Sequence, residues 1–226
     1  MSKKTLILSA AVILLLGLAG AGFYAYKKGF LSGFFASEEK KLTPEKLLTL
    51  EIKNSALTPE QVESFKERFN NAKETLQKDP NNFNAWLFLG VIKKGVGDYE
   101  GARDVFLHAA DLRPQSSTPF ANLADLYAYF LNEPQKAEES IKKAIANDSK
   151  DYSLYLALAD IYRYKFPDGE QKYEKTMLEA NNLFPDNVNL IGPLALFYRQ
   201  TNQVEKAIEW YEKLVKLSPD NQLAKE

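Results

Sequence analysis

Residues 83–116 read FNAWLFLGVIKKGVGDYEGARDVFLHAADLRPQS, and their apolar side chains recur three, four and seven positions apart. Residues at this spacing share one face of a helix. A glycine-containing turn at residues 95–99 interrupts the pattern, and Pro114 ends it. The stretch therefore predicts two helices joined by a short turn. One hairpin of this size cannot bury its apolar face alone, so further copies must stack on it.

The residues that end such a hairpin recur along the chain. Short polar turns hold Pro80, Pro114, Ser149, Pro185 and Pro219, at steps of 34, 35, 36 and 34 residues. A period in this range is typical of helix-turn-helix repeats. The extra residues of the two longer steps fall in the turns between paired helices, where a surface position tolerates insertions.

The apolar positions follow the same period. The first helices carry Trp86, Leu89 and Gly90; Phe120, Leu123, Ala124 and Tyr127; Tyr155, Leu158, Ala159 and Tyr162; and Ile191, Leu194, Ala195 and Tyr198. The second helices carry Ala102, Phe106 and Ala109; Ala137, Ile141 and Ala144; Tyr173, Met177 and Ala180; and Ala207, Tyr211 and Leu214. Small residues such as Gly90 permit close approach of the paired helix, and the large ones fill the space between hairpins.

This pattern resembles the tetratricopeptide repeat signature of Trp, Leu-Gly, Tyr, Ala, Phe, Ala and Pro at set offsets. The resemblance covers residues 83–221 and implies an all-α fold, a right-handed α-solenoid of about four hairpins. Their predicted bounds are residues 83–116, 117–151, 152–187 and 188–221. Two positions depart from the signature, Lys93 in place of tyrosine and Tyr173 in place of a small residue. We expect both to change local packing and to leave the fold intact.

A leading helix precedes the repeats. Thr58 is its expected cap, Pro59 lies in its first turn, and Gln61 occupies the capping-box position. Its apolar stripe continues to Leu76, and the helix is expected to end at Lys78. We expect it to cover the exposed face of the first repeat, which gives a repeat domain over residues 58–226.

The N-terminal residues 1–28 predict a transmembrane signal-anchor. Residues 5–26 are uncharged and lie between two lysine pairs, and about 20 apolar residues span a ~30 Å hydrocarbon core as a helix. The alternative is a cleaved signal peptide with residues 6–18 as its apolar region and Ala19-Gly20-Ala21 as its cleavage site. The anchor is favoured because the apolar run continues past that site. The repeat domain is then expected on the extracytoplasmic side. Gly17 and Ala21 also form a small-xxx-small pair that suits helix dimerisation.

Residues 29–57 predict a juxtamembrane linker, because they lack a sustained apolar period. Thr43-Pro44-Glu45 starts a short helix with Leu47, Leu48 and Leu50 on it. The helix lies either on the membrane or against the first hairpin, and its flanks are interpreted as solvated spacer.

No catalytic, cofactor-binding or metal-binding constellation is found. The chain has no cysteine and one histidine, His108, at a position that usually faces outward. A metal site would therefore need carboxylates alone. The net charge of -1 gives no basic surplus for nucleic acid. We therefore predict a chain that is not an enzyme, takes no cofactor or metal and does not bind nucleic acid.

The family resemblance implies a concave groove lined by the first helices, which suits a peptide or a partner helix. The positions beside the core stripe are Asn84, Leu87, Val91, Lys94, Asn122, Asp125, Tyr129, Leu156, Asp160, Arg163, Tyr164, Asn189, Leu196 and Arg199. Some family members hold a C-terminal carboxylate with lysine and asparagine at matched positions. Only Asn122 has the right type here, so that activity is not carried over.

The leading hypothesis is a membrane-tethered adaptor or scaffold that binds a protein partner in this groove. The alternative is a structural envelope protein that self-assembles through its last helix and its anchor. The last helix carries more apolar surface than the third repeat should cover, and a terminal repeat normally has a polar outer face. Trp210 is the candidate for an exposed interface residue, or else it simply covers the final turn.

Overall fold

The computed structural model describes residues 43–220, which form ten helices and no strand. The helices are α2 (Pro44–Leu47), α3 (Pro59–Lys78), α4 (Phe83–Gly95), α5 (Tyr99–Leu112), α6 (Thr118–Tyr129), α7 (Pro134–Asn147), α8 (Tyr152–Lys165), α9 (Gly169–Leu183), α10 (Val188–Gln200) and α11 (Val204–Leu217). The all-helical prediction is confirmed for this part of the chain. The predicted membrane span and the Gly17–Ala21 pair lie outside the described residues. Within residues 43–220, no helix is both long and apolar enough to cross a membrane.

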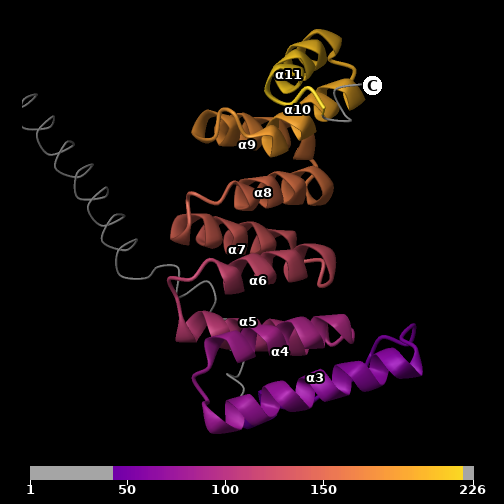
Figure 1. Ribbon diagram of the computed structural model, residues 1–226, viewed down its shortest axis with the longest axis vertical. Coiled ribbons are helices and arrows are strands. Elements are labelled where there is room, and N and C mark those ends of the chain that lie inside the picture. The colour runs from indigo at the N-terminus through magenta and orange to yellow at the C-terminus, as the bar shows by residue number, and fades with distance from the viewer. Residues whose placement is uncertain (1–42, 221–226) are drawn as a thin grey trace, which may run out of the picture. The chain divides into compact units, whose positions relative to one another are not determined.

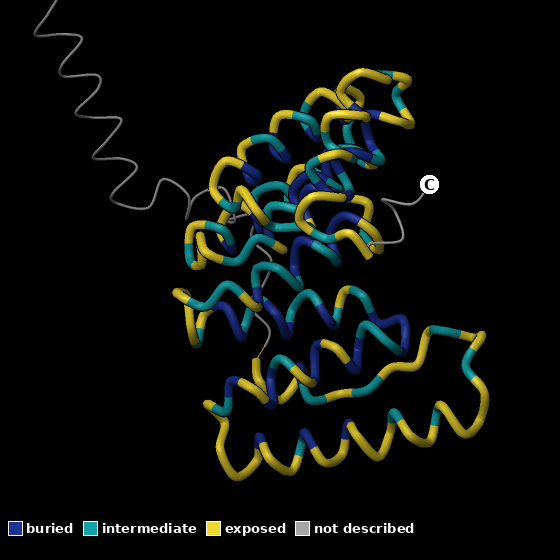
Figure 2. The backbone as a smooth tube through the Cα atoms, turned by 45° about the horizontal axis from the view of Figure 1, so that its top comes forward, coloured by how far each residue is buried: buried dark blue, intermediate teal, exposed yellow. Residues whose placement is uncertain are grey.

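Consecutive helices pair into hairpins, and each hairpin packs on the next (Figure 1). The pairs are α4 with α5, α6 with α7, α8 with α9, and α10 with α11, while α3 covers α4. The buried residues lie on the sides where helices meet, and the outer side of α3 is exposed (Figure 2). The stack therefore has the four hairpins and the leading helix that the spacing predicts.

The leading helix begins at the predicted cap. The Thr58 hydroxyl oxygen accepts from the Gln61 backbone N–H at 3.3 Å, and the Gln61 side chain accepts from the Thr58 N–H at 2.9 Å. This reciprocal pair satisfies two backbone donors that the helix itself leaves free. Phe69, Ala72 and Leu76 are buried against the first hairpin.

Small residues set how closely the paired helices approach. A Cβ added to Gly90 would lie 2.4 Å from Cε1 of Phe106, so α5 packs directly on the backbone of α4. Ala124, Ala159 and Ala195 hold the matching places in the later hairpins and are fully buried. Tyr173 stands at the second-helix position where the other repeats have Ala102, Ala137 and Ala207. Its buried ring lies 4.7 Å from the Phe197 ring, so it fills the space between two hairpins.

Tyrosine–glutamate hydrogen bonds join successive hairpins. The Tyr162 hydroxyl donates to Glu138 Oε1 at 2.8 Å, and the Tyr198 hydroxyl donates to Glu174 Oε1 at 2.9 Å. In each pair the tyrosine follows the glutamate by 24 residues. Burial and the hydrogen bond to Glu174 both raise the pKa of Tyr198. These bonds fix the register of one hairpin on the next, because each satisfies a half-buried polar group.

The segment before α3 packs on the first hairpin, which is one of the two positions left open by the sequence. Leu47 is buried in the core formed by α3, α4 and α5, and Leu48 and Leu50 pack against it. The backbone N–H groups of Lys53 and Asn54 both donate to the Val96 carbonyl, at 2.9 and 2.8 Å. Residues 44–54 therefore form a strap over the turn between α4 and α5.

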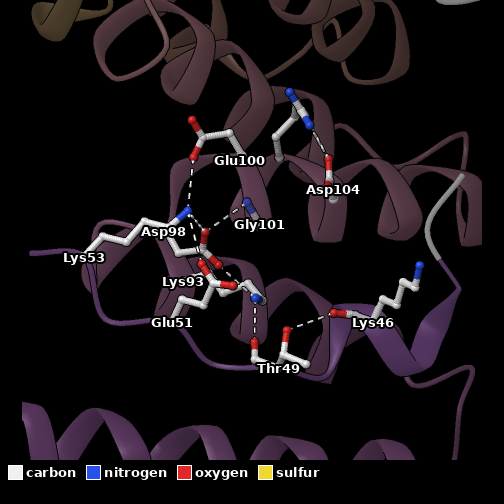
Figure 3. Close-up of polar contacts among 10 residues, drawn as sticks. Lys46, Thr49, Glu51, Lys53, Lys93, Asp98, Glu100, Gly101 and Asp104 are labelled. Atoms are coloured by element: carbon white, nitrogen blue, oxygen red, sulfur yellow. Dashed lines mark hydrogen bonds and ion pairs between the residues drawn. The ribbon is translucent and has the colours of Figure 1, made fainter. Parts of the chain in front are cut away.

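Two lysines and one carboxylate hold this strap in place (Figure 3). Buried Lys93 donates to the Thr49 carbonyl at 2.6 Å and to Asp98 Oδ2 at 3.0 Å. Lys53, from the strap itself, donates to Asp98 Oδ1 at 2.7 Å. Burial raises the pKa of Asp98, but hydrogen bonds from Lys53 and Lys93 outweigh it and hold this pKa below its ordinary value. Lys93 thus replaces the signature tyrosine with a charge that ties the strap to the first hairpin.

Candidate protein-binding face of the first helices

The predicted groove residues all lie on α4, α6, α8 and α10, and none of them is buried. We call the surface that they form the first-helix face. Its exposed members are Asn84, Val91, Tyr129, Tyr164, Asn189 and Arg199. Its half-buried members are Leu87, Lys94, Asn122, Asp125, Leu156, Asp160, Arg163 and Leu196. The face therefore presents apolar, aromatic and charged groups to solvent.

Side chains link neighbouring first helices across this face. Lys94 on α4 donates to Asp125 on α6 at 2.7 Å. The Lys165 ammonium of α8 lies 5.0 Å from the centre of the Tyr129 ring on α6. Arg163 on α8 donates to Gln200 on α10 at 2.7 Å. The first helices therefore share one continuous set of contacts from α4 to α10.

The centre of the face combines two tyrosines with two carboxylates. Tyr129 is 44% exposed and Tyr164 is 63% exposed. Burial raises the pKa of the Tyr129 hydroxyl, and the charges of Asp160 and Asp125 raise it further. Burial also raises the pKa of Asp160, against the opposing effect of Arg163. Exposed tyrosine rings that lie next to charged groups are characteristic of protein-binding surfaces.

Several predicted residues contribute little to an open surface. Leu87 and Leu156 pack against the hydrophobic cores of the hairpins. The Asn122 amide donates to the Thr118 carbonyl of its own helix at 2.9 Å. Asn189 donates to the Tyr152 hydroxyl at 2.9 Å, which joins α10 to α8. These side chains shape the face through local contacts.

Two exposed aromatic residues were missed by the sequence analysis. Phe88 is on α4 and Phe130 directly follows α6, and both are exposed. Arg68 of α3 lies 5.2 Å from the centre of the Phe88 ring, and Lys94 lies 5.2 Å from that of Phe130. Phe88 also lines a hollow of about 320 Å³ between α3 and α4, together with Asn71, Ala72, Thr75, Asn82, Asn84 and Ala85. Phe88 directly follows Leu87. A second set of helically spaced surface positions, shifted by one residue from that of Leu87, was the signal that could have identified Phe88.

The last helix carries Trp210, the candidate for an exposed interface residue. Its ring is half-buried and packs against the core of the last two hairpins, with Lys213 5.2 Å from the ring centre. The more exposed apolar side chains of α11 are Val204, Ile208, Val215 and Leu217. Trp210 is therefore only partly exposed, and its role as an interface residue stays a prediction.

The described residues include the single histidine of the sequence, His108. His108 packs edge-on against Trp86, with ring centres 4.4 Å apart. Over residues 43–220, no group of three or more histidine and carboxylate side chains is arranged to hold a metal ion.

Comparison with known proteins finds a matching family model and relatives that share part of the chain. The family model described as "Tetratricopeptide repeat" matches residues 83–116 and 194–221, in the first and last hairpins. The type IV pilus assembly protein PilF of Pseudomonas aeruginosa is 27% identical over 136 residues, which are 59% of this chain and 53% of that protein. Human Superkiller complex protein 3 is 33% identical over 63 residues, 28% of this chain and 4% of that protein. The chain thus matches about half of one relative and a small part of the other.

Solved structures share the fold. PilW, described as a widely conserved type IV pilus biogenesis factor, aligns with a TM-score of 0.55 at 19% identity, over 72% of this chain and 74% of its own. MamA aligns at 0.54 and 20% identity, over 66% and 85%. YrrB, described as a TPR protein with an unusual peptide-binding site, aligns at 0.52 and 16% identity, over 87% and 95%. At these identities the likeness concerns the fold alone.

Proposed function

Because the chain belongs to the tetratricopeptide repeat family, we propose that it is a protein-interaction scaffold whose first-helix face binds a peptide or helix of a partner protein. Proteins of this family typically serve as non-enzymatic scaffolds. The observation that carries the proposal is the set of exposed residues Phe88, Val91, Tyr129 and Tyr164 on the first helices, with Phe130 directly after α6. Clustered exposed aromatic and apolar residues mark interaction sites, whereas single ones do not.

The charges of the face favour a partner segment with both polar and apolar side chains. Lys94, Lys165 and Arg163 each lie over or beside an aromatic ring of the face. Asp125 on α6 pairs with Lys94, and Asp160 lies on α8, the helix that carries Arg163 and Lys165. An extended peptide or an amphipathic helix offers apolar anchors for the rings and polar groups for the charges. The printed names of PilF and YrrB, which mention assembly and a peptide-binding site, support a role of this kind.

The interaction is tested by a double substitution at the centre of the face. Tyr129→Ala with Tyr164→Ala is expected to reduce recovery of the partner about tenfold or more, since aromatic anchors carry much of the energy of an interface. Affinity purification of the full chain from membranes, followed by mass spectrometry, measures this recovery. Leu183→Ala is the matched control, because Leu183 is 58% exposed on a second helix. A partner list unchanged by the double variant would rule out this face.

We further propose that residues 5–26 tether this scaffold to a bilayer, with the repeats on the extracytoplasmic side. The support is the uncharged apolar run between two lysine pairs. Extraction of membranes with alkaline carbonate is expected to leave the full chain in the pellet. Ile13→Lys with Leu16→Lys should release it, because charges at the centre of a membrane helix are costly. The tether proposal fails if the unaltered chain is released by carbonate.

A further inference from the structure

The outer face of α11 carries apolar residues, and two of them, Ile208 and Val215, occupy positions that are buried or half-buried in the earlier second helices. Val204, Ile208 and Val215 lie four and seven residues apart and so share one face. They are 52%, 53% and 42% exposed. The counterparts of Val215 in the earlier hairpins are buried or half-buried, and they are Ala110, Ile145 and Asn181. Among residues 43–220, nothing covers the stripe on α11.

The chemistry of the stripe differs from that of the inner joints at one position. Glu138 and Glu174 accept hydrogen bonds from Tyr162 and Tyr198 of the following hairpins. The residue that corresponds to them in the last hairpin, 34 positions after Glu174, is Ile208. Isoleucine cannot accept a hydrogen bond from a tyrosine of a further repeat. The stripe is therefore suited to an apolar surface.

We propose that this stripe, Val204, Ile208 and Val215, is a self-association surface that pairs α11 with α11 of a second copy of the chain. The two helices run antiparallel about a two-fold axis between residues 209 and 210. Val204 and Val215 are equally far from that point, so each lies opposite the other on the second copy. Ile208 lies opposite Tyr211 in the same way. A stripe with this symmetry is self-complementary, as a two-fold interface requires.

Charges beside the stripe agree with this pairing. Glu205 and Lys216 are exposed near opposite ends of α11. Antiparallel pairing brings Glu205 of each copy close to Lys216 of the other. The two opposite-charge pairs steer the helices toward this orientation more than they add affinity.

The other end of the stack does not offer a partner surface for α11. The side of α3 that faces away from its buried stripe carries exposed Ser64, Glu67 and Glu74. Stacking the apolar stripe on this side would bury carboxylates without partners, which is costly. Pairing of α11 with α11 is therefore favoured over head-to-tail stacking. The surface area buried by one helix pair is small compared with that of a standard protein–protein interface. We therefore expect a weak, concentration-dependent dimer.

The absence of cysteine from the sequence allows a direct test by cross-linking. Glu212→Cys places one thiol beside the stripe, and Glu67→Cys places one on the outer side of α3. With a short bismaleimide, the purified full chain is expected to form a covalent dimer through residue 212 and none through residue 67. Adding Ile208→Lys and Val215→Lys to the Glu212→Cys chain should lower the dimer about tenfold, because the lysines would then be buried against Tyr211 and Val204 of the other copy.

The control adds Leu183→Lys to Glu212→Cys, which should leave the dimer unchanged. Circular dichroism checks that each variant keeps its helices, and the exposure of residues 183, 208 and 215 makes this expected. A Glu212→Cys chain that stays monomeric at high concentration would overturn the proposal. So would a dimer that survives the lysine pair, or cross-linking between residues 67 and 212 in a mixture of the two variants.

Discussion

Replacing Asp98 with alanine is expected to lower the free energy of unfolding by about 3–5 kcal/mol, because it leaves a buried ammonium without its carboxylate. Lys93 is 2% exposed and pairs with Asp98 at 3.0 Å. Asp98 also caps α5 by accepting from the Gly101 N–H. Urea denaturation followed by circular dichroism measures the change. We expect residues 44–54 to lose protection from hydrogen exchange at the same time.

The double variant Asp98→Asn with Lys93→Met tests whether the unpaired charge of Lys93 causes this loss of stability. Asparagine keeps a cap oxygen, and methionine removes the buried charge. The double variant should be more stable than Asp98→Asn alone, which keeps the unpaired Lys93. If the two were equally stable, the buried charge would not be the source of the loss.

The same pair predicts a dependence on pH. The hydrogen bonds from Lys53 and Lys93 hold the pKa of Asp98 in the folded chain below its unfolded value of about 3.9. The contribution of Asp98 to stability is therefore fully present above that unfolded pKa and is lost as the pH falls through the folded pKa. Asp98→Asn should remove this part of the acid sensitivity. Denaturation midpoints measured from neutral pH down through the acid range test it.

The second prediction concerns Trp86. Trp86→Ala is expected to lower the free energy of unfolding by about 3–5 kcal/mol, because it leaves a cavity in the first hairpin. Trp86 is buried among α3, α4 and α5, its ring contacts His108, and its Nε1 donates to the Pro80 carbonyl at 2.8 Å. Urea denaturation of the variant gives the loss directly.

Phe88→Ala is the control for Trp86→Ala. Phe88 is the same kind of residue on the same helix, but it is exposed. We expect it to change stability by less than about 1 kcal/mol. Equal losses at positions 86 and 88 would contradict the assignment of Trp86 to the core and of Phe88 to the first-helix face.

The period of large and small residues carried most of the prediction of the fold. Gly90 and its alanine counterparts recur at steps of 34, 35 and 36 residues, and all of them are buried where helices pair. Such contacts are local within one hairpin, so they leave a periodic signal in the sequence. The capping box at Thr58 was readable for the same reason, because it spans only a few neighbouring residues.

The strap was not predictable in this way. Lys53 meets Asp98 from 45 residues away, and Lys93 meets the backbone of Thr49 from 44 residues away. Contacts of that length leave no period, and the charges of residues 51–54 are equally typical of a solvated spacer. The sequence marked Lys93 only as a departure from the signature.

The residues of the first-helix face, too, were predictable only in part. Helical spacing identified Tyr129 and Tyr164 as surface residues of the first helices, and both are exposed. Phe130 was missed because it follows the last residue of α6, beyond the period. Spacing alone did not say how far Trp210 is exposed, because it does not give the rotation of α11 toward its partner helix; the residue is half-buried. The groove as a binding site stays a prediction.

Photo-cross-linking tests the central claim, binding of a partner by the first-helix face, most directly. A photoreactive phenylalanine analogue is placed at Tyr164 in one full chain and at Leu183 in another, since both side chains are largely exposed but lie on first and second helices respectively. Irradiation of membranes is expected to give a covalent partner adduct from position 164 and none from position 183. An adduct from position 183 alone would contradict the account.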